Sequence, residues 1–192
     1  MSVIPVTKKG AREKILDTAG RLFYEQGFRA VGIDTIIAEA DVAKMTLYAH
    51  FRSKDDLIVT YLKRAEEESW TWVNGMIAEI ASPRDKLVAI FDGVGELADS
   101  PECLGCAGQI TVTEFPDLEH PGRKVAVECK QKMREFLRGL AEQAELKEPD
   151  VLSDQLMLLM DGAYAVSRVF GPGNPARHVA GAAGALIQAH SP

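Results

Sequence analysis

The most restrictive feature of this sequence is a pair of short apolar repeats between Gly32 and Lys54, GIDTIIAEADVAKMTLYAHFRSK. The first repeat spaces its apolar side chains by three and four residues, as on one buried helical face: Ile33, Ile36, Ile37 and Ala40. The second repeat directs Val42, Leu47 and Phe51 inward. Asp41 lies between them, where a tight turn needs a residue that tolerates a left-handed backbone. The stretch therefore predicts two short helices joined by a turn.

The outward side chains of the second helix suit contact with DNA. Two short helices that cross steeply can present one of them to a major groove. Thr46 and Tyr48 offer hydroxyls to phosphates, and the nearby positive charges are Lys44, Arg52 and Lys54. Side chains at the helix start can reach base edges, and those are Lys44, Met45 and Thr46. An ordinary helical hairpin with an amphipathic surface explains the periodicity equally well.

The residue pattern of this stretch separates the two interpretations. The run TLYAHF from Thr46 to Phe51, followed by Lys54 and preceded by Phe23, Gly27 and Phe28, resembles the DNA-binding domain of the TetR family of bacterial transcriptional regulators. The resemblance covers roughly residues 10 to 60. It implies an all-helical homodimer whose C-terminal domain binds a small molecule, and it implies a protein that is not an enzyme.

Carried onto this chain, the resemblance assigns individual roles. It implies DNA contacts for Lys44, Met45, Thr46 and Tyr48, phosphate contacts mainly for His50 and Lys54, and an anchoring role for Thr35 in the first helix of the pair. Two positions depart from the family pattern, because Asp41 stands where Gly is usual and Ala43 where a capping Ser is frequent. A poor cap at Ala43 is expected to cost about 1 kcal/mol of local helix stability.

Charge is distributed unevenly along the chain. The 192 residues carry a net charge of -6, but residues 1 to 55 hold nine Lys or Arg and seven Asp or Glu, a balance of +2. The remaining residues therefore have a balance of -8. A weakly basic head on an acidic body is typical of a protein whose DNA-contacting part is separate from the rest.

Cysteine content and hydropathy indicate the cellular compartment of the protein. No apolar run approaches the roughly 20 residues of a membrane span, and MSVIPVTKKG lacks the pattern of a secretory signal. Three cysteines, an odd number, indicate reduced thiols. We expect a cytoplasmic protein without membrane association.

Periodicity and helix-capping residues predict an all-α fold of about nine helices in two domains. Residues 1–53 form the helix-turn-helix domain, and residues 54–192 form the ligand-binding and dimerisation domain. After an N-terminal arm over residues 1–10, the first helix spans 11–26 and stops at Gly27, and Ser53 caps a long helix over 54–81. Further helices are expected at 83–98, 100–115, 122–146, 149–170 and 175–189.

The helix expected at 149–170 is apolar on more than one side, so it should be buried on both. The segment after it contains small residues that permit close helix approach: Ala180, Gly181, Ala183 and Gly184. We therefore predict a homodimer through residues of about 150 to 190, which would give the two-fold symmetry needed to read two DNA half-sites. A monomer that buries the first of these helices centrally is the alternative.

Several motifs that could carry chemistry have simpler explanations. Cys103-Leu104-Gly105-Cys106 is expected on a helix. No second cysteine pair or nearby His completes a zinc site, and the β-strand context of a thioredoxin-like motif is missing. Buried small side chains that line a pocket are therefore favoured over a thiol switch. An exposed charged loop is favoured over a metal site for Glu114, Asp117, Glu119 and His120. No nucleophile-and-base motif or nucleotide-binding loop is present in the sequence, so no enzyme, metal or cofactor is expected.

The expected effector site is a pocket inside the helical body. Its candidate lining residues are Trp72, Met76, Phe91, Cys106, Gln109, Ile110, Met133, Met160 and Tyr164. Such a lining predicts a mostly apolar or aromatic effector. The leading hypothesis is a dimeric repressor that binds a pseudo-palindromic operator and is released by this effector. A helical small-molecule or thiol sensor with a non-functional DNA head is the alternative. Activation instead of repression, the operator and the effector's identity stay open.

Overall fold

The computed structural model describes residues 10–192, and every regular element in that range is helical. The elements are α1 (Ala11–Gln26), α2 (Ile33–Ala40), α3 (Lys44–His50), α4 (Lys54–Ile77), α5 (Pro83–Ala98), α6 (Ala107–Glu114), α7 (Pro121–Gln143), α8 (Pro149–Phe170), the 3₁₀ helix η1 (Pro175–His178) and α9 (Val179–Ala189). This confirms the predicted all-α fold. The predicted N-terminal arm falls almost entirely on residues 1–9, which lie outside the described range.

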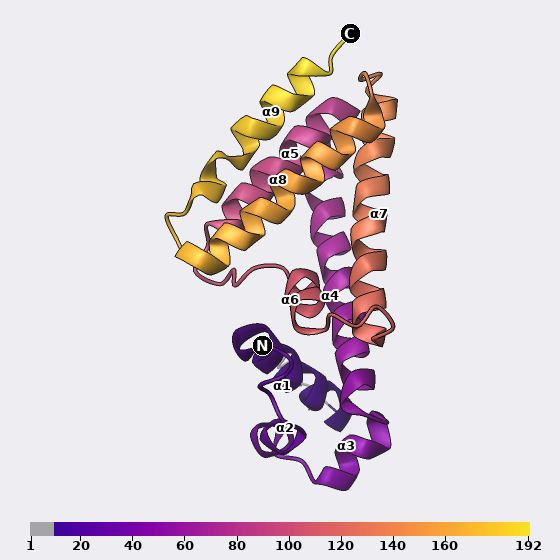
Figure 1. Ribbon diagram of the computed structural model, residues 1–192, viewed down its shortest axis with the longest axis vertical. Coiled ribbons are helices and arrows are strands. Elements are labelled where there is room, and N and C mark those ends of the chain that lie inside the picture. Colours follow the sequence, from indigo (N-terminus) through magenta and orange to yellow (C-terminus); the bar gives the residue numbers. More distant parts are fainter. Residues whose placement is uncertain (1–9) are drawn as a thin grey trace, which may run out of the picture.

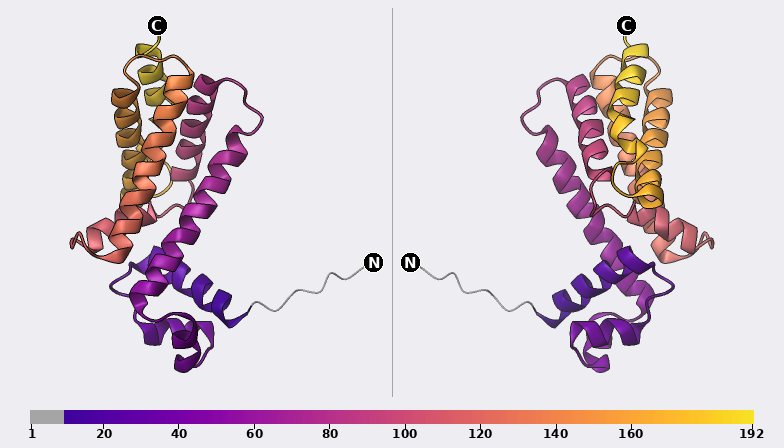
Figure 2. Two further views of the ribbon diagram at one scale, coloured as in Figure 1. Left: turned by 90° about the vertical axis from the view of Figure 1, so that its right-hand side faces the viewer. Right: turned by 90° about the vertical axis from the view of Figure 1, so that its left-hand side faces the viewer.

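The molecule is elongated, with a small helical head at one end and a larger helical body at the other (Figure 1). Helices α1 to α3 form the head, and the C-terminus lies at the far end of the body. Helix α4 leaves the head and runs up one side of the body (Figure 2). None of the helices in residues 10–192 has the length and apolar character needed to cross a membrane.

Two hydrophobic cores hold the head and the body. The core of the head is centred on Phe23 and Phe28, whose ring centroids lie 5.2 Å apart. This core also contains buried side chains from the first turns of α4 and from the body helices α6 and α7: Leu57, Ile58, Tyr61, Leu62, Ile110 and Val125. The body core joins α5, α7, α8 and α9 with the later turns of α4. The start of α4 is therefore packed as part of the head.

Several predicted helix ends are confirmed in atomic detail. The Ser53 hydroxyl accepts a hydrogen bond from the Asp56 amide at 3.1 Å, which caps α4. Gly27 has a φ of 89°, which explains the stop after α1. Asp41 has the left-handed φ of 52° and ψ of 56° expected between α2 and α3. Ala43 begins α3 without a side-chain hydrogen bond.

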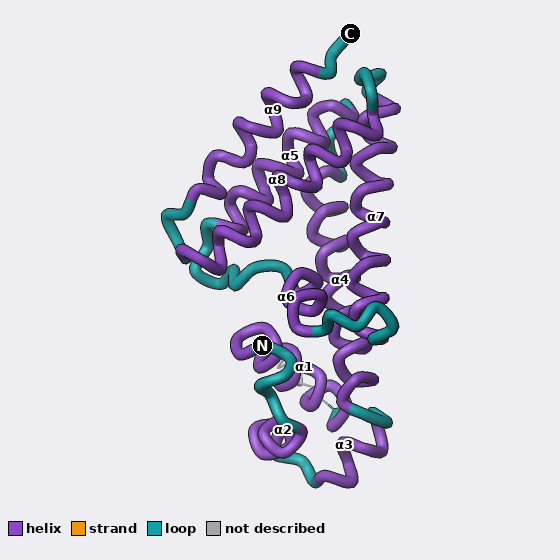
Figure 3. Tube along the Cα trace, in the orientation of Figure 1, coloured by secondary structure: helices purple, strands orange, loops and turns teal. Residues whose placement is uncertain are grey.

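The predicted helix over 100–115 is wrong in its first half. Residues 100–106 form a connection between α5 and α6, and α6 starts only at Ala107 (Figure 3). Gly105 has a φ of 97°, and a Cβ added there would lie 3.2 Å from the Tyr164 carbonyl oxygen of α8. The backbone at Leu104 and Gly105 is hydrogen-bonded to Tyr24 of the head. These backbone groups are used in tertiary contacts, so they cannot form a helix.

Other helix ends differ from the predictions by a few residues. Helix α4 ends at Ile77, although the pattern extended to residue 81, and α7 ends at Gln143. The last predicted helix is divided, because η1 precedes α9. The Asn174 side chain accepts a hydrogen bond from the Ala176 amide at 2.8 Å and so starts this tighter turn.

Candidate DNA-binding surface and ligand cavity

The surface of α2 and α3 carries the residues predicted to contact DNA. Leu47 is fully buried and fixes the rotation of α3. On the opposite side Met45 is 85% exposed and Tyr48 is 46% exposed. The side chains of Thr35, Lys44 and His50 are also exposed, whereas Thr46 and Lys54 are half-buried. All of them except Lys54 lie on α2 and α3, at the end of the molecule farthest from the C-terminus (Figure 1).

The two lysines of this surface, Lys44 and Lys54, have charged neighbours. The Lys44 ammonium lies 2.9 Å from the Asp34 carboxylate of α2, and this hydrogen bond raises the pKa of Lys44. Partial burial lowers the pKa of Lys54, while the carboxylates of Glu114 and Asp55 act in the opposite direction. Lys44 therefore remains charged at neutral pH, and Asp34 links it across the two helices of the motif.

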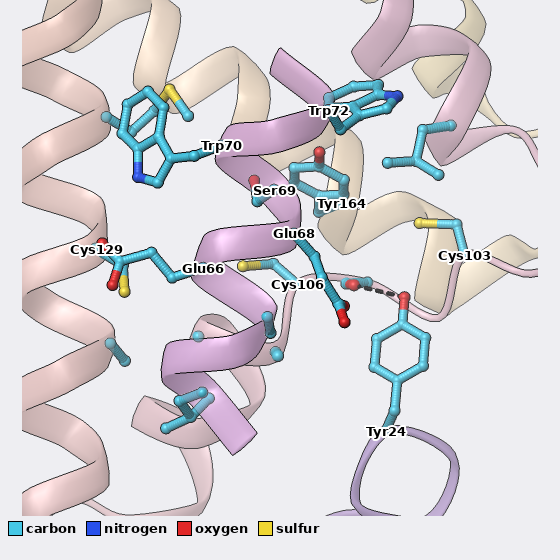
Figure 4. A pocket seen from close by; sticks show the side chains of 18 of the residues that line it. Tyr24, Glu66, Glu68, Ser69, Trp70, Trp72, Cys103, Cys106, Cys129 and Tyr164 are labelled. Atoms are coloured by element: carbon cyan, nitrogen blue, oxygen red, sulfur yellow. Dashed lines mark hydrogen bonds between the residues drawn. The ribbon is translucent and has the colours of Figure 1, made fainter. Parts of the chain in front are cut away.

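A cavity of about 550 Å³ lies in the body directly against the head. Its wall is formed by α1, α4, α5, α7, α8, the first turn of α6 and the connection before it. Figure 4 shows Trp72, Tyr164 and Cys106 around it, with Tyr24 on its head side. The aromatic side chains of the wall are Tyr24, Tyr61, Trp70, Trp72 and Tyr164. The cavity is large enough for a small organic molecule.

Most charged side chains of the cavity wall have partners of opposite charge. Arg64 lies 2.6 Å from Asp17 of α1, and Glu66 lies 2.8 Å from Lys132. Burial alone would raise the pKa of Glu66, but hydrogen bonds from Lys132, Cys129 and Trp70 hold it below its usual value. Lys130 is paired with Asp161. Paired charges leave little net attraction for an ionic ligand, so the wall suits a neutral molecule.

Tyr24 of α1 connects the head to the cavity wall. Its hydroxyl donates to the Gly105 carbonyl oxygen at 2.9 Å and accepts from the Leu104 amide at 2.9 Å. Burial, with the nearby Cys103 thiol, raises the pKa of Tyr24 to about 12. The phenol therefore stays protonated at neutral pH and keeps both hydrogen bonds. The sequence patterns did not indicate this residue.

Glu114 forms a second connection between head and body. Its carboxylate oxygens accept hydrogen bonds from the Phe28 amide at 3.0 Å and the Arg29 amide at 2.7 Å. The Arg29 guanidinium also lies over the Phe115 ring, 5.6 Å from its centroid. Glu114 was expected in an exposed charged loop, and it instead holds the end of α6 on the turn after α1. No local sequence pattern predicts these contacts, because Glu114 lies 86 residues after Phe28 and 85 residues after Arg29.

The other members of the acidic loop also have local partners. The His120 Nδ1 atom accepts a hydrogen bond from the Gly122 amide at 3.2 Å and so caps α7. The His120 ring stacks on Phe115 at 3.8 Å between centroids. Glu119 lies 2.6 Å from the Lys124 ammonium. Each of these contacts stabilises the turn between α6 and α7.

Comparison with known proteins defines the family. The model of bacterial regulatory proteins of the tetR family matches residues 15–60. The uncharacterised HTH-type transcriptional regulator YxaF of Bacillus subtilis is 43% identical over 150 residues, which cover 74% of this chain and 77% of YxaF. The chain belongs to the TetR family.

Two further comparisons cover most of the chain. The crystal structure of SCO4454, a TetR-family transcriptional regulator from Streptomyces coelicolor, has a TM-score of 0.89 and 30% identity, and the match covers 95% of this chain and 96% of that one. The HTH-type transcriptional repressor KstR2 of Rhodococcus jostii is 26% identical over 86% of this chain and 82% of its own length. The chain is a DNA-binding, ligand-responsive transcriptional regulator, and these relatives are regulators, not enzymes.

Five of the nine effector-site candidates in this TetR-family chain line the cavity, namely Trp72, Cys106, Met133, Met160 and Tyr164. The other four do not line it. Phe91 is fully buried in the body core, and Ile110 is buried in the core of the head. Met76 packs against the body core, and the Gln109 side chain donates to the Asp161 carbonyl oxygen at 3.0 Å. An apolar pattern alone does not distinguish a cavity wall from a packed core.

Proposed function

We propose that this protein is a cytoplasmic homodimeric repressor, without enzymatic activity, that binds a pseudo-palindromic DNA operator and releases it when a small neutral molecule enters the cavity. The single observation that carries the proposal is the hydrogen-bonded contact of Tyr24 with the cavity wall at Leu104 and Gly105. A change in the position of this wall is passed directly to α1 of the DNA-binding head. Repression is preferred because KstR2, a relative over most of the chain, is named a repressor.

Contacts with DNA are proposed for the exposed surface of α2 and α3 and for the start of α4. Lys44, Met45 and Thr46 would face the major groove. The Tyr48 hydroxyl, His50 and Lys54 would contact phosphates, and Thr35 would position α2. The exposure of Met45 and Tyr48 supports this assignment, because apolar and aromatic side chains at a surface often serve binding.

Dimerisation is proposed through α8 and α9. Helix α8 buries Leu152, Leu156 and Met160 against the body, yet it exposes Leu158 by 74% and Val169 by 71% on its other side. Small residues Gly181, Ala182 and Ala185 are exposed on α9, whereas Ala183 lies in the body core. An exposed apolar strip beside small residues supports close packing of two copies.

The effector is proposed to be uncharged and mostly apolar or aromatic. Tryptophan and tyrosine side chains dominate the wall, and the charged side chains there are mostly paired. A few polar atoms remain to orient the ligand, including the hydroxyls of Ser69 and Tyr164 (Figure 4). The alternative of a sensor with a non-functional head is not favoured, because the relatives are DNA-binding regulators.

Selection of genomic DNA fragments by the purified protein at near-physiological salt tests the proposal. We expect enrichment of a short inverted repeat. On that repeat, Tyr48→Phe should weaken binding roughly 3- to 10-fold through loss of one phosphate hydrogen bond. Lys54→Ala should weaken binding and reduce the salt dependence by about two counterions, one for each protomer of the dimer. Lys63→Ala, an exposed lysine farther along α4, is the control and should have no effect. Unpatterned binding, or full affinity in both variants, would contradict the proposed DNA surface.

A further inference from the structure

Three tyrosines line the cavity, and they differ in how their hydroxyls are hydrogen-bonded. The Tyr24 hydroxyl donates to the Gly105 carbonyl oxygen and accepts from the Leu104 amide. In the part of the chain that the structure describes, the hydroxyls of Tyr61 and Tyr164 have no hydrogen-bond partner in the protein. An enclosed hydroxyl without an acceptor is unfavourable, so these two groups are the ones that a ligand can satisfy.

Tyr164 of α8 is the better placed of these two tyrosines. Its ring packs against the body core, and its hydroxyl end lies in the cavity. Figure 4 shows this hydroxyl directed toward the part of the wall that Ser69 and Trp72 of α4 form. Tyr61 is only 8% exposed, because its ring is packed in the core of the head. A molecule in the cavity can therefore reach the Tyr164 hydroxyl without disturbing the head core.

The Tyr164 hydroxyl is a neutral hydrogen-bond donor. Burial raises the pKa of Tyr164, and the neighbouring thiols of Cys106 and Cys103 act in the same direction. The apolar side chains of the wall are poor acceptors for this proton. The thioether sulfur of methionine is a weak acceptor, and the indole nitrogen of tryptophan only donates. A good acceptor for Tyr164 must therefore come from the ligand.

The remainder of the wall favours an aromatic ligand. The Trp72 indole lies against Gly93 of α5, since a Cβ added at Gly93 would be 3.2 Å from the Cζ2 atom of Trp72. Trp70 packs edge-on against Phe136, with ring centroids 5.2 Å apart. These contacts fix the orientation of both indoles. Methionine sulfur atoms, which are also present in the wall, make favourable contacts with aromatic rings.

We propose that Tyr164 donates a hydrogen bond to the carbonyl oxygen of an uncharged aromatic carbonyl compound in the cavity, and that it selects this class of effector. The inference deepens the proposed function, and its regulatory part rests on that function. A carbonyl oxygen satisfies the Tyr164 hydroxyl without introducing a charge. A hydrocarbon of the same shape would enclose the hydroxyl without an acceptor, and this difference is the source of the selectivity.

The position of Tyr164 connects this hydrogen bond to the DNA-binding head. A Cβ added at Gly105 would lie 3.2 Å from the Tyr164 backbone carbonyl oxygen. One turn farther along α8, the Arg168 guanidinium donates to the Leu104 carbonyl oxygen at 2.8 Å. Tyr24 of α1 is hydrogen-bonded to the same two residues of the connection. A carbonyl compound held by Tyr164 therefore lies beside the segment through which the body contacts the head.

Benzophenone and diphenylmethane are a matched pair of probes, because a carbonyl group joins the two rings in the first and a methylene group in the second. Equilibrium dialysis of each compound against the full-length protein gives its dissociation constant. Tyr164→Phe should weaken benzophenone binding roughly 3- to 10-fold, through loss of one hydrogen bond, and leave diphenylmethane binding unchanged. The control is Thr71→Val, which removes an exposed hydroxyl of α4 outside the cavity and should affect neither compound.

Benzophenone also reports where it binds. Near-ultraviolet irradiation cross-links the bound ketone to adjacent side chains, and mass spectrometry of peptides locates the cross-link. We expect cross-links to residues of the cavity wall. Cross-links confined to other surfaces, or no binding of benzophenone by the native protein, would overturn the proposed ligand class.

The remaining outcomes concern Tyr164 itself. An equal loss of both compounds in Tyr164→Phe, or no loss of either, would overturn its assignment as the donor. A selective loss of benzophenone in Tyr61→Phe, with none in Tyr164→Phe, would do the same. These measurements involve no DNA. Failure of the protein to select any repeat, or full operator affinity in the benzophenone complex, would contradict the proposed function and not the hydrogen bond from Tyr164.

Discussion

The two residues between α2 and α3 that differ from the family pattern have different consequences. Asp41 adopts the left-handed backbone that the turn requires, so the substitution for Gly preserves the geometry. Ala43 has an extended backbone with φ of −73° and ψ of 149°, as an N-cap residue should, but it has no oxygen to accept a hydrogen bond. The amide of Thr46 instead bonds the Ala43 carbonyl oxygen at 2.9 Å. The start of α3 is therefore under-stabilised.

Ala43→Ser should stabilise the protein by about 1 kcal/mol, because the new hydroxyl can accept a hydrogen bond from an amide in the first turn of α3. Thermal unfolding and urea unfolding of the full chain measure this change. The control is Ala49→Ser, an exposed position inside the same helix where serine should be neutral or slightly destabilising. Equal effects of the two serines would show that the cap is not the cause.

At the scale of the elements, the connection of residues 100–106 links the head, the body and the cavity. Toward the head it is hydrogen-bonded to Tyr24, and toward the body the Arg168 guanidinium donates to the Leu104 carbonyl oxygen at 2.8 Å. The same segment carries Cys103 and Cys106 into the cavity wall. One irregular connection therefore contacts the head, the body and the ligand space at once, which a regular helix could not do with its backbone groups paired internally.

Tyr24→Phe should weaken the attachment of this connection to α1 while leaving the fold intact. The Leu104 amide would lose its acceptor, so we expect its hydrogen exchange to accelerate roughly 10-fold, as for a locally opened segment. Exchange measured with the full chain at residue resolution provides the test. Tyr61→Phe removes another tyrosine hydroxyl near the cavity and is the matched control, because its ring contacts lie in the core of the head. An unchanged Leu104 exchange rate in Tyr24→Phe would refute the proposed connection.

At the scale of the whole molecule, the proposed dimer interface is one long face of α8. Leu158 and Val169 lie on the side of this helix that does not pack against the body core, and they are accompanied by exposed Phe170. Water contact with such an apolar strip is unfavourable, so a second copy is the simplest cover. Paired heads would then meet two DNA half-sites.

Leu158→Glu should shift the protein from dimer to monomer and lower operator affinity by at least roughly 10-fold, because a buried unpaired carboxylate is costly. Sedimentation velocity and DNA titration at the same protein concentrations check both effects. Leu118→Glu is the matched control, since Leu118 is 70% exposed in the turn between α6 and α7, away from α8. A dimeric Leu158→Glu protein would exclude this face as the interface.

The helices of the head and most helix ends could be predicted from the sequence, because they depend on local sequence signals. Apolar spacing placed Leu47 inward, and Ser53, Pro83 and Gly27 marked helix boundaries as the structure has them. The connection of residues 100–106 was missed because Ser100 and Pro101 are typical of a helix start. Its backbone is engaged by the distant side chains of Tyr24 and Arg168, which no local sequence signal indicates.

The cavity could be predicted only in part for a related reason. Trp72 and Phe91 have the same apolar character, but one lines the cavity and the other is fully buried in the body core. The distinction depends on how α4, α5 and α8 are spaced, which residue types do not encode. Glu66 and Lys130 also lie in the cavity wall, where each is held in an ion pair, and a search for apolar residues does not select such charged side chains.

Helix α4 begins inside the hydrophobic core of the head, and this core also receives Ile110 and Val125 from the body. A fragment that stopped at residue 53 would leave Phe23 and Phe28 without the side chains of Leu57 and Tyr61 that cover them. Chimeras that exchange DNA specificity between related regulators therefore need a junction beyond Leu62, together with matched residues at 110, 114 and 125. The exchanged segment must include the whole packed interface between head and body. A junction in the loop between α3 and α4 would divide that interface.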